Sequence, residues 1–273
     1  MWRDLRTRIL TAIILIPLAL YAVYAGSWPF QVFLIVVGAG LLMECSRLIH
    51  PDIKPVWWGS ASLYLALLVI LDLSLSALFG AWAAGVIMLM LLHMSGRESA
   101  RAVMIAFVYC GGFIIAFKWL RGDNPAGFLI CLFIFAIVWS TDIFAYFVGR
   151  LIGGPKLWPA VSPSKTWAGA IGGASAAMLI SLAFINLFQG VGSILFLLMA
   201  LMTSVASQAG DLWESALKRR AGVKDSGNLL PGHGGIFDRV DGLIAAVWVV
   251  MLILLFINLL GAGANLNILP QLQ

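Results

Sequence analysis

Long apolar runs constrain this chain more than any other feature. Nine of them supply close to the roughly 20 residues that a helix needs to cross the hydrocarbon core of a bilayer. They lie near residues 9–25, 28–46, 56–73, 75–94, 102–120, 126–149, 167–188, 191–210 and 242–261. Their apolar residues do not alternate with polar ones, and a single span in lipid satisfies its backbone only as a helix. The sequence therefore predicts an all-α polytopic membrane protein with about nine transmembrane helices.

Composition supports a membrane protein. Of the 273 residues, 62% are apolar and 11% are charged, whereas a soluble domain has about 45–50% apolar and about 25% charged residues. In a membrane protein a net charge of +5 reflects topology, so we expect no nucleic-acid partner. Cys45, Cys110 and Cys131 lie in or beside apolar runs without a C-x-x-C pair. This predicts packing roles, not a disulfide or a zinc site.

The distribution of Lys and Arg predicts the orientation in the membrane. With nine spans and a cytoplasmic N-terminus, 15 of the 17 basic residues fall on the cytoplasmic side, and only Lys118 and Arg121 fall opposite. This asymmetry is what the positive-inside rule requires. We therefore expect the C-terminus outside and the two long polar connections, 150–166 and 211–241, in the cytoplasm.

The first part of the connection after residue 210 is predicted to be the last turns of the preceding helix. Residues 211–222 follow an apolar span without a break, and Gly222 is a plausible C-cap. At helical spacing Asp211, Ser215 and Lys218 share a face. The basic residues could simply meet lipid headgroups, and that interpretation stays open for them. The carboxylate at the membrane edge would be costly if it were unpaired, which favours a functional role.

The second half of this connection, 222–242, is predicted to be a loop that leads into a helix. It contains six glycines and one proline, which exclude a continuous helix. Gly234 and Gly235 allow close backbone approach to a ligand, with amide N–H groups available to an anion. Asp238 and Asp241 are three residues apart, so one helix face would present both. Acids in a first helical turn also suit the helix dipole, which is the structural alternative.

The third polar stretch runs over residues 140–166. Asp142 lies about eight residues inside the preceding span, roughly 12 Å from its end, and an acid within a span is a candidate functional residue. The motif SPSKT ends in Lys-Thr but lacks the glycine that a P-loop needs before the Lys. Its polar residues could still bind phosphate at the start of the next helix. They are Ser162, Ser164, Lys165 and Thr166.

Carboxylates, basic side chains and glycines thus gather at one membrane face. Carboxylates without cysteine suit a hard cation such as Mg²⁺ better than zinc. Mg²⁺ with Lys, Arg and amide donors is the combination that handles phosphates. The sequence therefore predicts N-terminal transmembrane helices, residues 1–120, followed by a C-terminal transmembrane region, 121–273, that carries phosphate chemistry.

One 27-residue stretch resembles a known family. From Ser215 to Asp241 the chain is similar to the phosphatidate cytidylyltransferase (CDP-diacylglycerol synthase) family. The matching residues are Ser215, Lys218, Arg219, Lys224, Asp225, Gly227, Leu230, Pro231, His233, Gly234, Gly235, Asp238, Arg239 and Asp241. The segment with Asp142 and Lys165 also looks like this family, whereas the first 120 residues are similar only as hydrophobic helices with a basic start.

The resemblance implies an enzyme of phospholipid biosynthesis in the bacterial inner membrane, with its site facing the cytoplasm. It implies the Mg²⁺-dependent reaction of CTP with phosphatidate in the bilayer, which gives CDP-diacylglycerol and diphosphate. Asp211 and Asp238 match the acids of a paired-cation centre. Asp241 is expected as a third metal ligand or as a hydrogen-bond partner of the ligands, and Lys218 is expected as a catalytic residue that contacts the substrate phosphates. The second cation is not identified, and a homodimer is left open. Substrate contacts are expected from Asp142, Ser162, Ser164, Lys165, Thr166, Ser215, Arg219, Lys224, His233, Gly234, Gly235 and Arg239.

Two other functional classes fit the sequence less well. A transporter or channel that used Asp142, Asp211 and Asp238 as an ion path would distribute acids across membrane depth, whereas most of them lie at one face. No internal repeat supports an inverted-repeat transporter. A transferase that consumes a CDP-lipid would carry several aspartates among glycines and alanines on adjacent helices, an arrangement that is missing here.

Overall fold

The computed structural model describes residues 2–185 and 193–259, with side chains from Thr11 onward except Ala12. These residues form helices α1 (Trp2–Ala25), α2 (Ser27–Ile49), α3 (Pro55–Ile70), α4 (Leu75–Met94), α5 (Glu98–Ala106), a π-helical turn η1 (Phe107–Gly111), α6 (Gly112–Arg121), α7 (Pro125–Ile152), α8 (Trp167–Ile185), α9 (Ser193–Arg220) and α10 (Phe237–Leu259), with two short strands, β1 (Lys156–Trp158) and β2 (Ser162–Thr166). The predicted span ends at 186–188, 191–192 and 260–261, and the predicted external C-terminus, lie outside the described residues.

The predicted helical architecture is confirmed. Each of the nine predicted spans coincides with a helix, and the span predicted at 102–120 consists of α5, η1 and α6 in succession. Seven helices in the described ranges are long and apolar enough to cross a membrane, and two shorter apolar helices, Ile13–Ala25 and Pro55–Ile70, accompany them. The chain is therefore a membrane-integral protein. The two strands, which the sequence did not predict, lie in the connection between α7 and α8.

The chain forms two compact units. The N-terminal unit contains the residues up to Trp119 together with Leu217–Val240, and the C-terminal unit contains Leu120–Ala216 together with the chain from Asp241 on. The polar connection after residue 210 is thus divided, because its middle part packs with the N-terminal helices.

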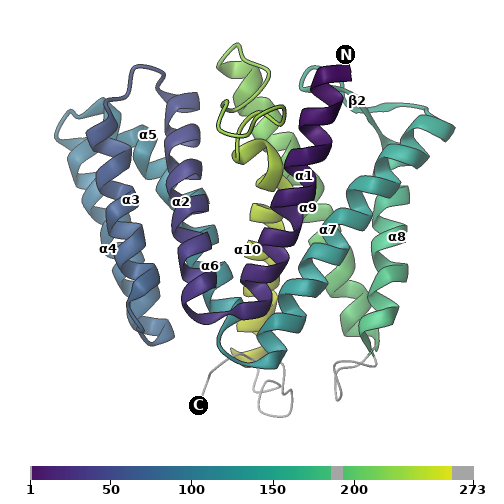
Figure 1. The fold of residues 1–273 in the computed structure, drawn as a ribbon, viewed down its shortest axis with the longest axis horizontal. Helices are drawn as coiled ribbons and strands as arrows, with labels where there is room; N and C mark the ends of the chain where they lie inside the picture. Colours follow the sequence, from purple (N-terminus) through teal and green to yellow (C-terminus); the bar gives the residue numbers. More distant parts are fainter. Residues whose placement is uncertain (1, 186–192, 260–273) are drawn as a thin grey trace. The chain divides into compact units, whose positions relative to one another are not determined.

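In the N-terminal unit, α2 packs on α1, α3 and α5, and α3 lies beside α4 (Figure 1). Most of the buried side chains of α2 are apolar, and Leu34 and Leu41 are buried completely. At the end of α3, Lys118 donates from Nζ to the carbonyl oxygens of Leu68 at 3.3 Å and Leu71 at 2.6 Å. One of the two basic residues on the predicted external side therefore caps a helix C-terminus.

In the C-terminal unit, α7 and α8 pack closely along their length (Figure 1). Small residues allow this approach, because a β-carbon at Gly169 would lie 2.6 Å from the carbonyl oxygen of Ala145, and one at Gly173 would lie 2.7 Å from that of Thr141. Thr141 also donates from its hydroxyl to Ser204 Oγ at 2.8 Å, which joins α7 to α9. The helix faces that carry the polar side chains of this unit are therefore held by close backbone packing.

Cysteine labelling will test the predicted orientation. Asp72, in the turn after α3, and Lys224, in the connection after α9, are both exposed, whereas the three native cysteines are buried. We expect a membrane-impermeant maleimide to label the Lys224→Cys variant only from the cytoplasmic side and the Asp72→Cys variant only from the opposite side, because of the positive-inside distribution. Labelling of both variants from one side would contradict the nine-span topology.

Candidate functional site

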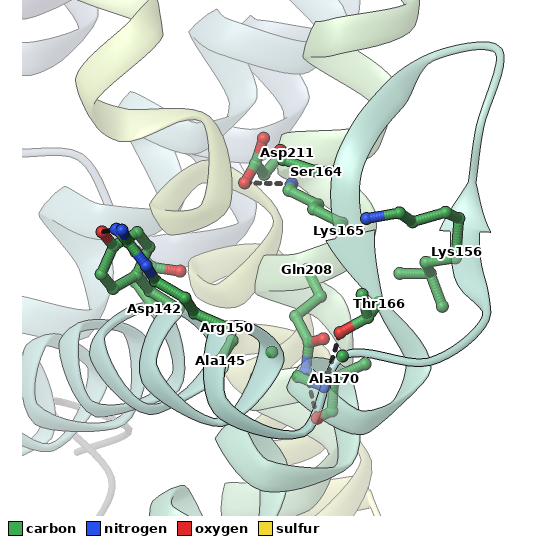
Figure 2. Close-up of a pocket in the computed structure, with 15 residues that line it drawn as sticks. Asp142, Ala145, Arg150, Lys156, Ser164, Lys165, Thr166, Ala170, Gln208 and Asp211 are labelled. Atoms are coloured by element: carbon green, nitrogen blue, oxygen red, sulfur yellow. Dashed lines mark hydrogen bonds and ion pairs between the residues drawn. The ribbon is translucent and has the colours of Figure 1, made fainter.

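A polar cavity of about 630 Å³ lies in the C-terminal unit. It is bounded by α7, α8, α9 and the hairpin of β1 and β2, and Figure 2 shows the charged side chains around it. Its lining residues include Asp142, Tyr146, Arg150, Lys156, Ser164, Lys165, Thr166, Gln208 and Asp211. Five of these were predicted from the sequence as site residues: Asp142, Ser164, Lys165, Thr166 and Asp211. The structure therefore brings the SPSKT motif together with two predicted acids.

The hairpin positions the basic residues at the cavity. Helix α7 ends where Gly153 adopts a φ of 67°, a left-handed conformation that favours glycine. The strands then pair antiparallel, with Lys156 opposite Thr166, and the N–H of Trp167 donates to the carbonyl oxygen of Pro155 at 3.0 Å. This register places Lys156 beside the end of β2, where Lys165 precedes the start of α8.

An ion pair joins the hairpin to α9. Lys165 Nζ contacts the Asp211 carboxylate, and about a third of each side chain is exposed, 29% and 33% respectively. Asp142 interacts electrostatically with both members of the pair, since Asp211 repels its carboxylate and Lys165 attracts it. The ion pair is thus partly exposed to solvent and lies close to a third charged group, Asp142.

Four carboxylates interact in this unit. Asp241, the fifth residue of α10, is repelled by Asp211 and Glu214 of α9 and by Asp142 of α7. Ser215, predicted to contact the substrate, lies one turn after Asp211 on α9, with its Oγ 3.5 Å from Asp211 Oδ1. Within the described ranges, no three His, Cys, Asp or Glu side chains form a group that could enclose a metal ion by themselves.

Sequence reasoning missed two basic residues of the cavity. Arg150 and Lys156 were counted only for topology, although they flank the glycine–proline turn that ends α7. Arg150 donates from Nη1 to the Tyr146 hydroxyl at 2.7 Å, and its guanidinium carbon lies 6.0 Å from that ring's centroid. With Lys165, they give the cavity three basic side chains. The sequence did not indicate this grouping, because it depends on the fold of the hairpin.

The hydroxyl residues of the SPSKT motif have different surroundings. Thr166 is buried, and its Oγ1 accepts the N–H of Gly169 at 3.1 Å, so it caps the first turn of α8. Ser164 lines the cavity. Ser162 is buried at the far end of β2, where it pairs with Trp158. The predicted phosphate contacts of the motif are thus best placed at Ser164 and Lys165.

The remaining predicted residues lie in the N-terminal unit, where α9 ends as expected. Gly222 has a φ of 69°, and the N–H of Val223 donates to the carbonyl oxygen of Lys218 at 3.0 Å, which confirms the predicted C-cap. Arg219 donates from Nη1 to the carbonyl oxygen of Val223 at 3.4 Å, and Lys224 is exposed.

Asp238 is the most heavily bonded acid of this unit. Its Oδ1 pairs with Lys218 Nζ at 2.6 Å. Its Oδ2 accepts the N–H groups of Ser226 and Gly235, each at 2.8 Å, and lies 2.9 Å from Ser226 Oγ. The side chain is 4% exposed and that of Lys218 is 13% exposed. The carboxylate therefore organises the loop before α10 as well as the basic residue at the end of α9.

The loop closes through a tight turn. The N–H of Leu230 donates to the carbonyl oxygen of Gly234, and the N–H of His233 donates to that of Leu230, both at 2.9 Å. Arg239 donates from Nε to the carbonyl oxygen of His233 at 3.1 Å. The predicted residues His233 and Gly234 are thus held by backbone hydrogen bonds, and the Arg239 side chain binds the same turn.

Glu44 is a functional candidate that the sequence analysis missed. It lies on α2, is 2% exposed, and accepts hydrogen bonds from Ser226, Ile236 and Phe237. The signal was present, because an acid in a membrane span is costly without partners. That reasoning was applied to Asp142 and would have identified Glu44 as well.

The predicted site residues thus fall into two groups. The C-terminal unit contains Asp142, Ser162, Ser164, Lys165, Thr166, Asp211, Ser215 and Asp241, and the N-terminal unit contains Lys218, Arg219, Lys224, His233, Gly234, Gly235, Asp238 and Arg239. The predicted sharing of a cation by Asp211 and Asp238 concerns one residue from each unit and stays a prediction.

The chain is similar to known proteins along most of its length. Residues 6–257 match the model of the cytidylyltransferase family. A phosphatidate cytidylyltransferase of Brucella abortus biovar 1 (strain 9-941) is 43% identical over 247 residues, which cover 89% of this chain and 90% of the relative. A phosphatidate cytidylyltransferase of Bacillus subtilis (strain 168) is 33% identical over 258 residues, covering 88% of this chain and 94% of the relative.

Proposed function

The chain belongs to the cytidylyltransferase family, and on this premise we propose that it transfers the cytidylyl group of CTP to phosphatidate. The products are CDP-diacylglycerol, a precursor in phospholipid synthesis, and diphosphate. The observation that carries the proposal is the cavity of the C-terminal unit, where three basic side chains and Asp211 surround about 630 Å³.

This cavity is the proposed CTP site. Its volume lies within the range of about 300–1,000 Å³ that is typical of ligand pockets. Arg150, Lys156 and Lys165 supply the positive charge that a triphosphate needs, and Ser164 adds a hydroxyl donor. Asp211 holds Lys165 at the cavity through their ion pair.

The reaction is a direct displacement at phosphorus. A phosphate oxygen of phosphatidate attacks the α-phosphorus of CTP and forms a new P–O bond, while the bond to the oxygen that bridges to the β-phosphate breaks. The electron pair of that bond leaves with diphosphate. The lipid phosphate is the nucleophile, so no covalent enzyme intermediate is needed. The protein's task is to bring two polyanions together, and its basic side chains offset their repulsion and stabilise the departing charge.

The carboxylates of the C-terminal unit fit a hard divalent cation. Asp211 and Asp241 repel each other, and a cation between such groups relieves the repulsion. Mg²⁺ commonly binds through one or two carboxylates together with water and substrate phosphates. Asp211 and Asp241, both of the C-terminal unit, would hold it. When bound, Mg²⁺ supplies neutralisation of the phosphate charge.

The two substrates come from different phases. CTP is water-soluble and phosphatidate lies in the leaflet, so the site works at the membrane surface. The basic residues predicted on the cytoplasmic side support a site that faces the cytoplasm of a bacterial inner membrane. Lys218, Arg239 and Lys224 of the N-terminal unit are proposed as contacts of the lipid phosphate.

An assay with purified full-length protein tests the proposal. The protein in detergent micelles containing phosphatidate is incubated with Mg²⁺ and CTP labelled in the cytosine ring, and the organic phase is analysed for labelled lipid. We expect labelled CDP-diacylglycerol that depends on phosphatidate and disappears with excess EDTA. Label that stays in the aqueous phase with every divalent cation tried would refute the proposal. Formation of lipid product in EDTA would refute the role of the metal alone.

A further inference from the structure

Glu44 is a buried carboxylate in a membrane-spanning helix, and the proposed reaction does not use it. Its side chain accepts three hydrogen bonds from the segment that carries Asp238. We propose that Glu44 is a positioning residue, which holds this segment, and through it Asp238, in the arrangement that cytidylyl transfer requires. The catalytic part of this inference rests on the proposed function, whereas the contacts themselves do not.

Glu44 binds the first N–H groups of α10. Its Oε1 accepts the N–H of Ile236 at 3.1 Å, and its Oε2 accepts the N–H of Phe237 at 2.9 Å. The first N–H groups of a helix have no partner within the helix, and they attract negative charge. The carboxylate of α2 therefore caps α10 at the residue before Asp238, and this fixes where that side chain emerges from the backbone.

Ser226 links the two carboxylates. Its Oγ lies 3.1 Å from Glu44 Oε2 and 2.9 Å from Asp238 Oδ2, and its N–H donates to the same Asp238 oxygen at 2.8 Å. A hydroxyl has only one proton to donate. The strength of the hydrogen bond from Ser226 to one carboxylate therefore depends on whether the other carboxylate competes for that proton. Displacement of Glu44 would therefore change the bonding of Asp238 directly, as well as through the backbone.

Two glycines of the loop permit the close approach to Glu44. A β-carbon at Gly235 would clash with the Glu44 carboxylate and with Ser226 Oγ, and one at Gly227 would lie 2.8 Å from Glu44 Cδ. On α2 itself, a β-carbon at Gly40 would lie 2.5 Å from Ile236 Cδ1. The backbone of the loop before α10 thus packs closely against the Glu44 side chain and against α2. Such close packing is typical of a segment held in one position.

The Glu44→Gln variant tests the inference with two readouts. Gln keeps the shape but replaces one acceptor oxygen with an NH₂ group, which then faces a backbone N–H donor. Loss of one charge-assisted hydrogen bond should raise the equilibrium constant for local opening of the loop by roughly 10-fold or more. We expect amide hydrogen exchange in peptides covering 224–237 to accelerate by about this factor, and kcat to fall in parallel. The KM for CTP should stay within about twofold, because Glu44 does not line the CTP cavity.

Matched controls separate positioning from general damage. Ser46 lies two residues along α2 and is fully buried, and its hydroxyl has no hydrogen-bond partner among the described residues. The Ser46→Ala variant should therefore match the wild type in both readouts. If Glu44→Gln does not fold, the Ser226→Ala variant, which removes the linking hydroxyl, decides the question by the same measurements.

Three outcomes would overturn the inference. They are unchanged exchange at 224–237 in the folded variant, faster exchange with unchanged kcat, and a raised KM for CTP with unchanged kcat. Absence of cytidylyl transfer in the wild type would refute the proposed function instead, and hydrogen exchange would still show whether Glu44 holds the loop.

Discussion

The Asp211→Asn variant is expected to lose cytidylyl transfer by on the order of a hundred- to a thousandfold, the effect of removing a group that stabilises charge at a reacting centre. Asn keeps the shape but cannot neutralise a cation. It also ends the ion pair with Lys165, which lines the same cavity. The measurement is the rate of labelled CDP-diacylglycerol formation at several Mg²⁺ concentrations, alongside a size-exclusion profile.

The fold should survive this change, because a partly exposed ion pair contributes only about 0–1 kcal/mol to stability. The Asp52→Asn variant, at an exposed acid in the turn after α2, provides a control that should retain full activity. Wild-type activity of Asp211→Asn at ordinary Mg²⁺ would remove Asp211 from the metal site, and the ligands would then have to be sought among Asp142 and Asp225.

The Lys165→Ala variant is expected to lower kcat/KM for CTP by roughly 10- to 150-fold, the equivalent of one charge-assisted contact with phosphate. Lys165 contacts Asp211 and lies in the cavity, so its loss removes positive charge and leaves the carboxylate without that partner. Steady-state kinetics over a range of CTP concentrations will measure the effect.

Two further variants show whether charge is responsible. Lys165→Arg keeps the positive charge and should retain more activity than Lys165→Ala. Lys54→Ala, at an exposed position before α3, should behave as the wild type. Equal kinetics for Lys165→Ala and wild type would exclude Lys165 from the phosphate site.

The helices could be predicted from the sequence because the signal for a membrane span is local. About 20 apolar residues identify a span wherever it packs, so α2, α4 and α7 were found without tertiary information. The hairpin of β1 and β2 could not be found in this way. Its strands are three and five residues long, and their pairing depends on the turn after Gly153 and on packing against α8.

The sequence predicted which kinds of residue form the site, but not which of these residues contact one another. The types and spacing of Asp211, Lys165 and Asp238 indicated phosphate handling. Which acid pairs with which base depends on contacts between distant segments, and the structure pairs Lys165 with Asp211 and Lys218 with Asp238. The partners of Glu44 could not be predicted, because they come from the far end of the chain.

Those late partners impose an order on biosynthesis. Ser226 follows Glu44 by 182 residues and Ile236 by 192, so a ribosome working at about 5–20 residues per second needs on the order of 10–40 s to add them. Throughout that interval α2 exists without the groups that satisfy its acid, and an acid within a membrane span is costly without partners. A nascent chain that stops before Ser226 leaves this carboxylate without those partners in a membrane helix, so the packing around Glu44 is completed only late in synthesis.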